Sequence, residues 1–90
     1  MGAAEATLEI KNRLGLHLRA ASTLFQTIKD FKSSVTVWNG DQEANARSVT
    51  SLITLGAGQG TKLQVKVLGP DATATMAAVK AVFEARFGEE

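Results

Sequence analysis

The single histidine of this 90-residue chain, His17, is the residue best suited to reversible chemistry near neutral pH. It lies in the stretch GLHLRAAS, residues 15–22, where Arg19 follows it by two positions and an alanine pair comes next. Because alanine favours helix, we expect a helix that begins at about Leu18, with His17 at or near its N-cap.

This position would give the imidazole an anion-binding environment. The first amides of a helix have no intrahelical acceptors, and the helix dipole adds about half a positive charge there. The dipole disfavours a protonated ring, so a neutral nitrogen remains as nucleophile, and the planar guanidinium of Arg19 suits phosphate oxygens. The pattern predicts transient phosphorylation of His17. The simpler alternatives are a histidine that only caps the helix or packs its ring, and a solvated Arg19.

The sequence around His17 favours a carrier over an enzyme with its own turnover. No carboxylate occurs between Lys11 and Lys29, and no nearby residue resembles a base that would activate water. A dipole contribution of about 0.3–1 kcal/mol would orient a phosphoryl group without trapping it.

Composition argues against several other classes of function. A net charge of +1, four phenylalanines and one tryptophan offer little to a nucleic acid. With no cysteine and one histidine, we expect no metal site and no cofactor. The start of the chain has no signal-peptide pattern, and no apolar run approaches the ~18 residues of a membrane span. We therefore expect a cytoplasmic protein without membrane insertion.

Seven elements must position His17. Strand-like alternation runs over 6–11, 35–38 and 62–67, and a return strand near 42–46 follows the dipeptide Asn39-Gly40, which favours positive φ. Helical spacing begins at Leu18, after Ser48 and after the break at 69–71. The apolar residues with helical spacing in the first and last helices, which we expect to be buried, are Ala21, Leu24, Phe25, Ile28, Met76, Val79, Val82, Phe83 and Phe87. In the short helix after Ser48, Val49, Leu52 and Ile53 share one side.

The order β-α-β-β-α-β-α predicts one α+β domain over residues 1–90. Four mostly antiparallel strands would form an open-faced β-sandwich with three helices on one face, so that each apolar stripe is buried. The glycine-rich segment 56–60 lacks the Gly-Lys-Ser/Thr of a nucleotide-binding loop, and we interpret it as a tight connection.

From about Thr7 to Phe87 the chain resembles the HPr family, the histidine-containing phosphocarriers of the bacterial phosphotransferase system. The matching segments, in the family's order and spacing, are NRLGLHLRAAS, FKSSVTV, NARSVTSLITLGAGQG and GPDATATMAAVKAVF. Details such as VWNG, EANARSV and AVFEARFGEE are more similar to the nitrogen-branch paralogue than to the sugar-transport proteins.

The resemblance implies roles for three residues. His17 matches the phosphorylated histidine of the family pattern Gly-Leu-His-Ala-Arg-Pro-Ala, and Arg19 matches its partner. Enzyme I, or its nitrogen-branch paralogue, would phosphorylate Nδ1 of His17, and the group would pass to a histidine of a IIA-type domain. Ser48 matches a regulatory serine that a dedicated kinase phosphorylates in some bacteria; from the residues alone, it caps a short helix. We expect a monomer.

Two residues depart from the family pattern. Leu18 replaces the usual alanine, and Ala20 replaces proline. Alanine accepts the same backbone and restores an N–H donor, but the turn loses the rigidity that proline gives. We expect transfer to be retained with an altered choice of partner, so both residues belong to the predicted partner-binding set.

The resemblance also implies a docking surface beside His17. Its predicted members are Val49, Thr50 and Ile53 on the outer side of the short helix, continued by Ser22, Gln26 and Lys29. A small apolar centre with a polar rim suits a transient interface. The alternative is simple burial of the apolar residues of that helix.

Two other functions remain open at this stage. A regulatory binding module on the same scaffold would have lost transfer and act by docking, although the presence of both His17 and Arg19 argues against it. A small RNA-binding α+β domain would need aromatic residues on the sheet surface, where Trp38 is the only strand candidate.

Overall fold

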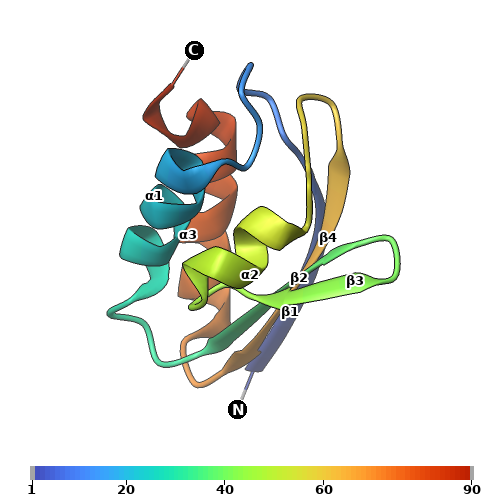
Figure 1. Ribbon diagram of the computed structural model, residues 1–90. Coiled ribbons are helices and arrows are strands. Elements are labelled where there is room, and N and C mark those ends of the chain that lie inside the picture. Colours follow the sequence, from blue (N-terminus) through green and yellow to red (C-terminus); the bar gives the residue numbers. More distant parts are fainter. Residues whose placement is uncertain (1, 90) are drawn as a thin grey trace.

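The computed structural model describes residues 2–89 and shows one four-stranded sheet with its helices packed on one face (Figure 1). The strands are β1 (Gly2–Glu9), β2 (Ser34–Asn39), β3 (Gln42–Asn45) and β4 (Lys62–Gly69). The helices are α1 (Leu18–Ile28), α2 (Val49–Thr54) and α3 (Ala72–Glu84), followed by the short turn η1 (Arg86–Gly88). The strand order is β1-β4-β2-β3, and each pairing is antiparallel. The predicted open-faced sandwich is confirmed.

Alternation in the central strand β4 decides which face of the sheet is covered. Leu63, Val65 and Val67 are buried beneath the helices. The intervening residues face the open side, where Lys66 lies opposite Glu5 and Lys62 opposite Glu9 across the β1 pairing. Since each fully buried aliphatic side chain contributes about 1.5–3 kcal/mol, the covered face supplies much of the stability.

The helices complete the core with the residues that the 3.6-residue period predicts. Ala21, Leu24 and Ile28 of α1 are fully buried, and Met76, Val79 and Phe83 of α3 are at most 4% exposed. These side chains and those of the sheet form one continuous cluster. Phe25 and Val82 are only half-buried.

The strand boundaries differ from the predicted ones at both ends of the sheet. β1 begins at Gly2, four residues before the expected start, because the whole strand pairs with β4 from Gly2↔Gly69 to Glu9↔Lys62. In the β2–β3 hairpin, Asn39 pairs with Gln42 and is the last residue of β2. The two-residue loop is therefore Gly40-Asp41, with Gly40 at φ +60, the position that a type II′ turn reserves for glycine. The hairpin that Asn39-Gly40 predicts is thus present, and of these two residues Gly40 takes the positive φ.

The chain reverses direction after α3. Its spacing predicted that Phe87 belongs to the last helix. However, α3 ends at Glu84, and Phe87 lies in η1 with a non-helical backbone. Arg86 and Phe87 take φ of +57 and +54, and Gly88 takes +76, which makes this turn left-handed. Phe87 is nevertheless 2% exposed and packs against Phe83, with ring centroids 4.9 Å apart. The turn brings the end of the chain beside the start of α1 (Figure 1).

The loop that precedes α1 is fixed by the connection between α2 and β4. The Leu16 amide donates to the Ala57 carbonyl at 2.9 Å. Gly15 has φ +74, and a Cβ there would lie 2.5 Å from the same carbonyl oxygen, so only glycine fits. Segment 56–60 is thus a structural connection, as predicted.

Within residues 2–89, no helix combines the length and the apolar character that a bilayer crossing requires.

Candidate functional site

His17 occupies the N-cap of α1, as the sequence predicts. Its backbone is extended (φ −85, ψ −174), and its carbonyl accepts the first intrahelical bond, from the Ala21 amide at 2.9 Å. The amides of Leu18, Arg19 and Ala20 therefore lie in the first turn without intrahelical acceptors. That turn contains no acidic residue, and within the described chain no side chain caps it. The helix end keeps its capacity for an anion.

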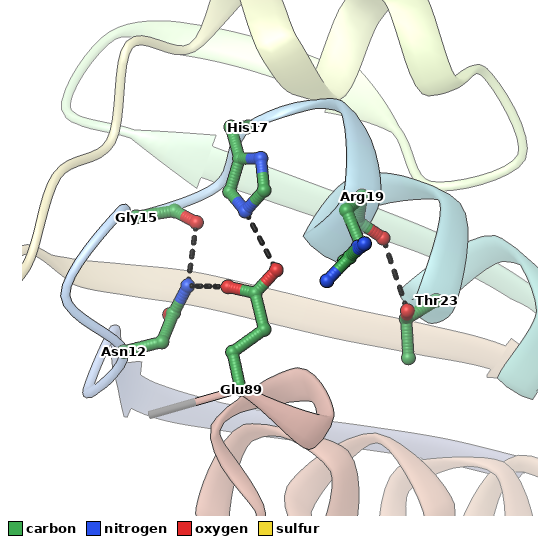
Figure 2. A network of polar contacts seen from close by, with 6 residues as sticks. All are labelled: Asn12, Gly15, His17, Arg19, Thr23 and Glu89. Atoms are coloured by element: carbon green, nitrogen blue, oxygen red, sulfur yellow. Dashed lines mark hydrogen bonds and ion pairs between the residues drawn. The ribbon is translucent and has the colours of Figure 1, made fainter.

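The His17 ring is held by a carboxylate that comes from the other end of the sequence. Nε2 lies 2.7 Å from Glu89 Oε2, with the ring 33% exposed and the Glu89 side chain 10% exposed. Figure 2 shows the carboxylate below the ring, with the second ring nitrogen, Nδ1, directed away from it. The chain has no carboxylate between Lys11 and Lys29, but the fold brings one to the ring, so the expectation of little local repulsion of a phosphate was incomplete. It considered only neighbours along the chain, and Glu89 is 72 residues away.

A carboxylate in this place selects one form of the neutral ring. An ionised carboxylate can only accept a hydrogen bond, so the Nε2 atom that faces it must carry the proton. The lone pair of the neutral imidazole then lies on Nδ1. Within residues 2–89, the only side-chain hydrogen bond of the ring is the one at Nε2.

Several groups keep Glu89 ionised. Desolvation by burial raises the pKa of its carboxyl, but hydrogen bonds from Asn12 and His17, together with the charges of His17 and Arg19, outweigh it and lower the pKa overall. The Asn12 bond joins Nδ2 to Glu89 Oε1 at 2.8 Å. The carboxylate is thus held at both oxygens.

Arg19 lies on the solvent side of the same group of residues. Its backbone carbonyl accepts from the Thr23 hydroxyl at 3.0 Å, while its guanidinium extends beside Glu89 (Figure 2). His17 and Arg19 line an open hollow of about 580 Å³, together with Arg13, Leu14, Gly88 and Glu89. The residues that line the hollow include two arginines and one carboxylate beside the ring, and the net positive charge suits a phosphate.

Most of the predicted partner-binding residues are exposed or half-buried, and one of them, Ala20, is fully buried. Leu18 is 64% exposed and Ile53 is 39% exposed. Thr50, Gln26 and Lys29 are exposed, while Val49 and Ser22 are half-buried. Ala20 has no exposed area, because at the third position of α1 its methyl group points into the core. Ala20 therefore cannot contact a partner through its side chain, and its placement in the partner-binding set was wrong.

A second hollow connects the ring to α2. It has a volume of about 270 Å³ and is lined by Leu14, Leu16, His17, Ile53, Gly56, Ala57 and Gly58. Leu14, which sequence reasoning did not select, is 67% exposed at its rim. The exposed side chains of Leu14 and Ile53 thus line a hollow together with the imidazole, and the exposed Leu18 follows His17 in the chain.

Ser48 is the N-cap of α2, as its residue type predicts. Its backbone is extended, and Oγ accepts from the Ser51 amide at 3.3 Å. The neighbouring Arg47 donates to the carbonyls of Phe31 at 2.7 Å and Ser33 at 3.1 Å, just beyond the end of α1.

Comparison with known proteins identifies the family. The family description "PTS HPr component phosphorylation site" matches residues 4–85. The phosphocarrier protein HPr of Xylella fastidiosa is 40% identical over 86 residues, which cover 96% of this chain and 97% of that protein. This chain belongs to the HPr family.

Members of both branches of the family and solved HPr structures agree with this assignment. The phosphocarrier protein NPr of Escherichia coli is 38% identical, over 93% of this chain and 94% of its own. The crystal structure of HPr-C-His from Thermoanaerobacter tengcongensis is 36% identical and superposes with a TM-score of 0.91, over 97% and 98% of the two chains. The family and these relatives support a phosphocarrier function in the phosphotransferase system for this chain.

Within the part of the chain that the structure describes, no group of three or more histidine, aspartate or glutamate residues is placed to hold a metal ion.

Proposed function

We propose that His17 accepts the phosphoryl group on Nδ1 and passes it on. The observation that carries this proposal is the 2.7 Å contact between Nε2 and Glu89, since it leaves Nδ1 as the nitrogen with the lone pair. The ring is 33% exposed, which allows a protein donor to approach it.

The start of α1 would hold the transferred group. The free amides of Leu18, Arg19 and Ala20 and the guanidinium of Arg19 supply donors to the phosphoryl oxygens. Alanine at position 20 contributes an N–H that proline would lack. Each of these contacts is modest at an open surface, so the group is oriented and can still leave.

The transfer needs no proton to enter or leave the ring. The Nδ1 lone pair forms the new N–P bond while the bond from phosphorus to the donor breaks, and the donor keeps that electron pair. The ring keeps its proton on Nε2 and gains a positive charge, which lies 2.7 Å from the Glu89 carboxylate. In the next step the phosphoryl group leaves for a histidine of the acceptor, the ring recovers its lone pair, and the charge disappears.

The exposed residues around His17 would meet its partners. We propose Enzyme I, or its nitrogen-branch paralogue, as donor and IIA-type domains as acceptors, all in the cytoplasm and with this chain acting as a monomer. Leu18, Ile53 and Thr50 would lie at the centre of the contact, with Val49, Ser22, Gln26 and Lys29 around them. A small apolar centre with a polar rim favours fast release.

Ser48 would be a second, regulatory phosphorylation site in hosts that have the dedicated kinase. A phosphate there adds about −1.5 to −2 charges at the start of α2, next to Val49 and Thr50. The helix end tolerates that charge, while a partner with an acidic contact surface would bind less well.

The test is phosphorylation with labelled phosphoenolpyruvate and either Enzyme I or its nitrogen-branch paralogue. We expect an acid-labile, base-stable label that His17→Ala abolishes and that Arg19→Gln slows. Thr7→Ala, on the open face of the sheet, is the matched control and should be labelled like the wild type. Absence of label with both kinases, together with retained binding to a IIA-type domain, would favour a regulatory binding module instead.

A further inference from the structure

Asn12 links the loop before α1 to the carboxylate that contacts His17. It follows β1 and has no exposed area. Its Nδ2 atom donates to the Gly15 carbonyl at 2.7 Å and to Glu89 Oε1 at 2.8 Å (Figure 2). Glu89 Oε2 in turn lies 2.7 Å from His17 Nε2. One amide, one carboxylate and one imidazole are therefore connected in series.

The carbonyl end of the same amide has a different environment. Oδ1 of Asn12 is buried and has no hydrogen-bond partner among residues 2–89. A buried acceptor without a partner is costly, and native structures contain few of them. Rotating the amide by half a turn would not help, because Oδ1 would then face two acceptors, the Gly15 carbonyl and Glu89. The orientation of Asn12 is therefore set by what its nitrogen holds.

Glu89 needs such an anchor. It follows Gly88 and the left-handed turn at Arg86 and Phe87, and its backbone amide donates to the Arg86 carbonyl at 2.9 Å, a bond that leaves the side chain free to rotate. Its side chain has three rotatable bonds, and contacts at both oxygens would restrict them to one arrangement.

We propose that Asn12 is a positioning residue for phosphoryl transfer, because it holds Glu89 Oε1 so that Oε2 faces His17 Nε2 and keeps the lone pair on Nδ1. This inference rests on the proposed function of His17 for its effect on transfer, but its effect on the ring is independent of any partner. The effect on Glu89 agrees with the geometry. After desolvation, which raises the pKa of Glu89, the Asn12 hydrogen bond is the largest influence and lowers it.

The test uses the unphosphorylated full chain first. Imidazole ¹⁵N shifts, at a pH where the ring is neutral, report which nitrogen carries the proton, and a ¹³C titration of the Glu89 carboxyl reports its pKa. In Asn12→Ala we expect a several-fold larger fraction of Nδ1–H rings and a higher Glu89 pKa. Asn12→Asp, nearly equal in shape, should raise the Glu89 pKa further, because two carboxyl groups would share the contact. Asn45→Ala, which removes an asparagine that accepts from the Arg47 amide, is the matched control.

Transfer is then measured in a double-mutant cycle with Glu89→Gln. We expect Asn12→Ala to slow phosphorylation of His17 by roughly tenfold in the wild-type background and by less than twofold when Glu89 is already changed. An equal loss in both backgrounds, or unchanged Glu89 titration and ring protonation in folded Asn12 variants, would overturn the inference and leave Asn12 with a role in the loop alone. If the wild type were not phosphorylated, the proposed function would fail, while the two spectroscopic measurements would still decide what Asn12 does to the ring.

Discussion

Replacing Glu89 with glutamine tests the link between the end of the chain and the reactive histidine. The side chain keeps its shape but loses its charge, and when its single carbonyl oxygen accepts from His17 Nε2–H it no longer accepts from Asn12 Nδ2. In the phosphorylated ring, the positive charge lies 2.7 Å from this position, and Glu89 is 10% exposed while His17 is 33% exposed. The substitution therefore removes the electrostatic part of a contact that is partly shielded from water.

The size of the effect follows from the energy of such contacts. A hydrogen bond to a charged group contributes about 1.5–3 kcal/mol, and the open side of the ring places this one near the lower limit. A neutral hydrogen bond retains roughly half of that. The phosphorylated state should lose about 1 kcal/mol relative to the unphosphorylated one, which is roughly a fivefold change in an equilibrium constant. Glu89→Ala removes the contact from both states, so it should shift the equilibrium by the difference between them, again about 1 kcal/mol or roughly fivefold, and not by the full energy of the hydrogen bond.

The assay is the equilibrium of phosphoryl exchange with Enzyme I, measured from the labelled fraction of each variant. The fold and the N-cap of α1 should be unchanged in both variants, which the amide spectrum checks. A labelled fraction within twofold of the wild type for both Glu89→Gln and Glu89→Ala would refute the reasoning, because the carboxylate would then not stabilise the charged ring.

Three further predictions concern stability and the motif. Arg86→Gly should raise the melting temperature by about 2–4 °C in calorimetry, because glycine adopts the φ of +57 without the steric strain of a side chain. The greater entropy of glycine in the unfolded chain offsets part of this gain, and a lower melting temperature would contradict a strained turn. Asp71, which accepts hydrogen bonds from Lys32 and Ser33, has its pKa lowered from 3.8 to about 2, so its contribution to stability is complete above about pH 4 and is lost as the pH falls towards 2. The melting temperatures of the wild type and Asp71→Asn should therefore converge over that interval, and a constant difference would exclude this origin. Ala20→Pro should leave the helix intact, because the Ala20 amide makes no intrahelical bond. It should speed phosphorylation of His17 only modestly, because the more rigid turn is partly offset by the loss of the Ala20 N–H donor; loss of labelling would contradict this view of the turn.

The sequence predicts the parts of this site that depend on local order. The N-cap position of His17, the start of α1 at Leu18 and the cap at Ser48 follow from residue types and from a helical period that the core satisfies. The resemblance of the surrounding residues to the HPr family predicted the family to which the chain belongs, and the comparisons confirm it.

The contact with Glu89 could not be predicted in the same way. It depends on left-handed backbone at Arg86 and Phe87, a conformation that both residue types disfavour, and on burial of Phe87 to hold the turn. The burial of Ala20 was missed for a smaller reason. Ala20 was assigned to the partner-binding surface because it lies close to His17 in the family's motif. The helical period of α1 places its side chain in the core with Leu24.

The strand order also determines when the sheet can form. Among residues 2–89, β1 pairs only with β4, and Gly2 pairs with Gly69, so the first strand has no partner until residues 62–69 have been synthesised. The β2–β3 hairpin, whose strands are joined by two residues, can close long before that. Because distant pairings must overcome the entropy of closing a long loop, we expect the emerging chain to assemble from its middle outward, with the reactive loop ordered only at the end.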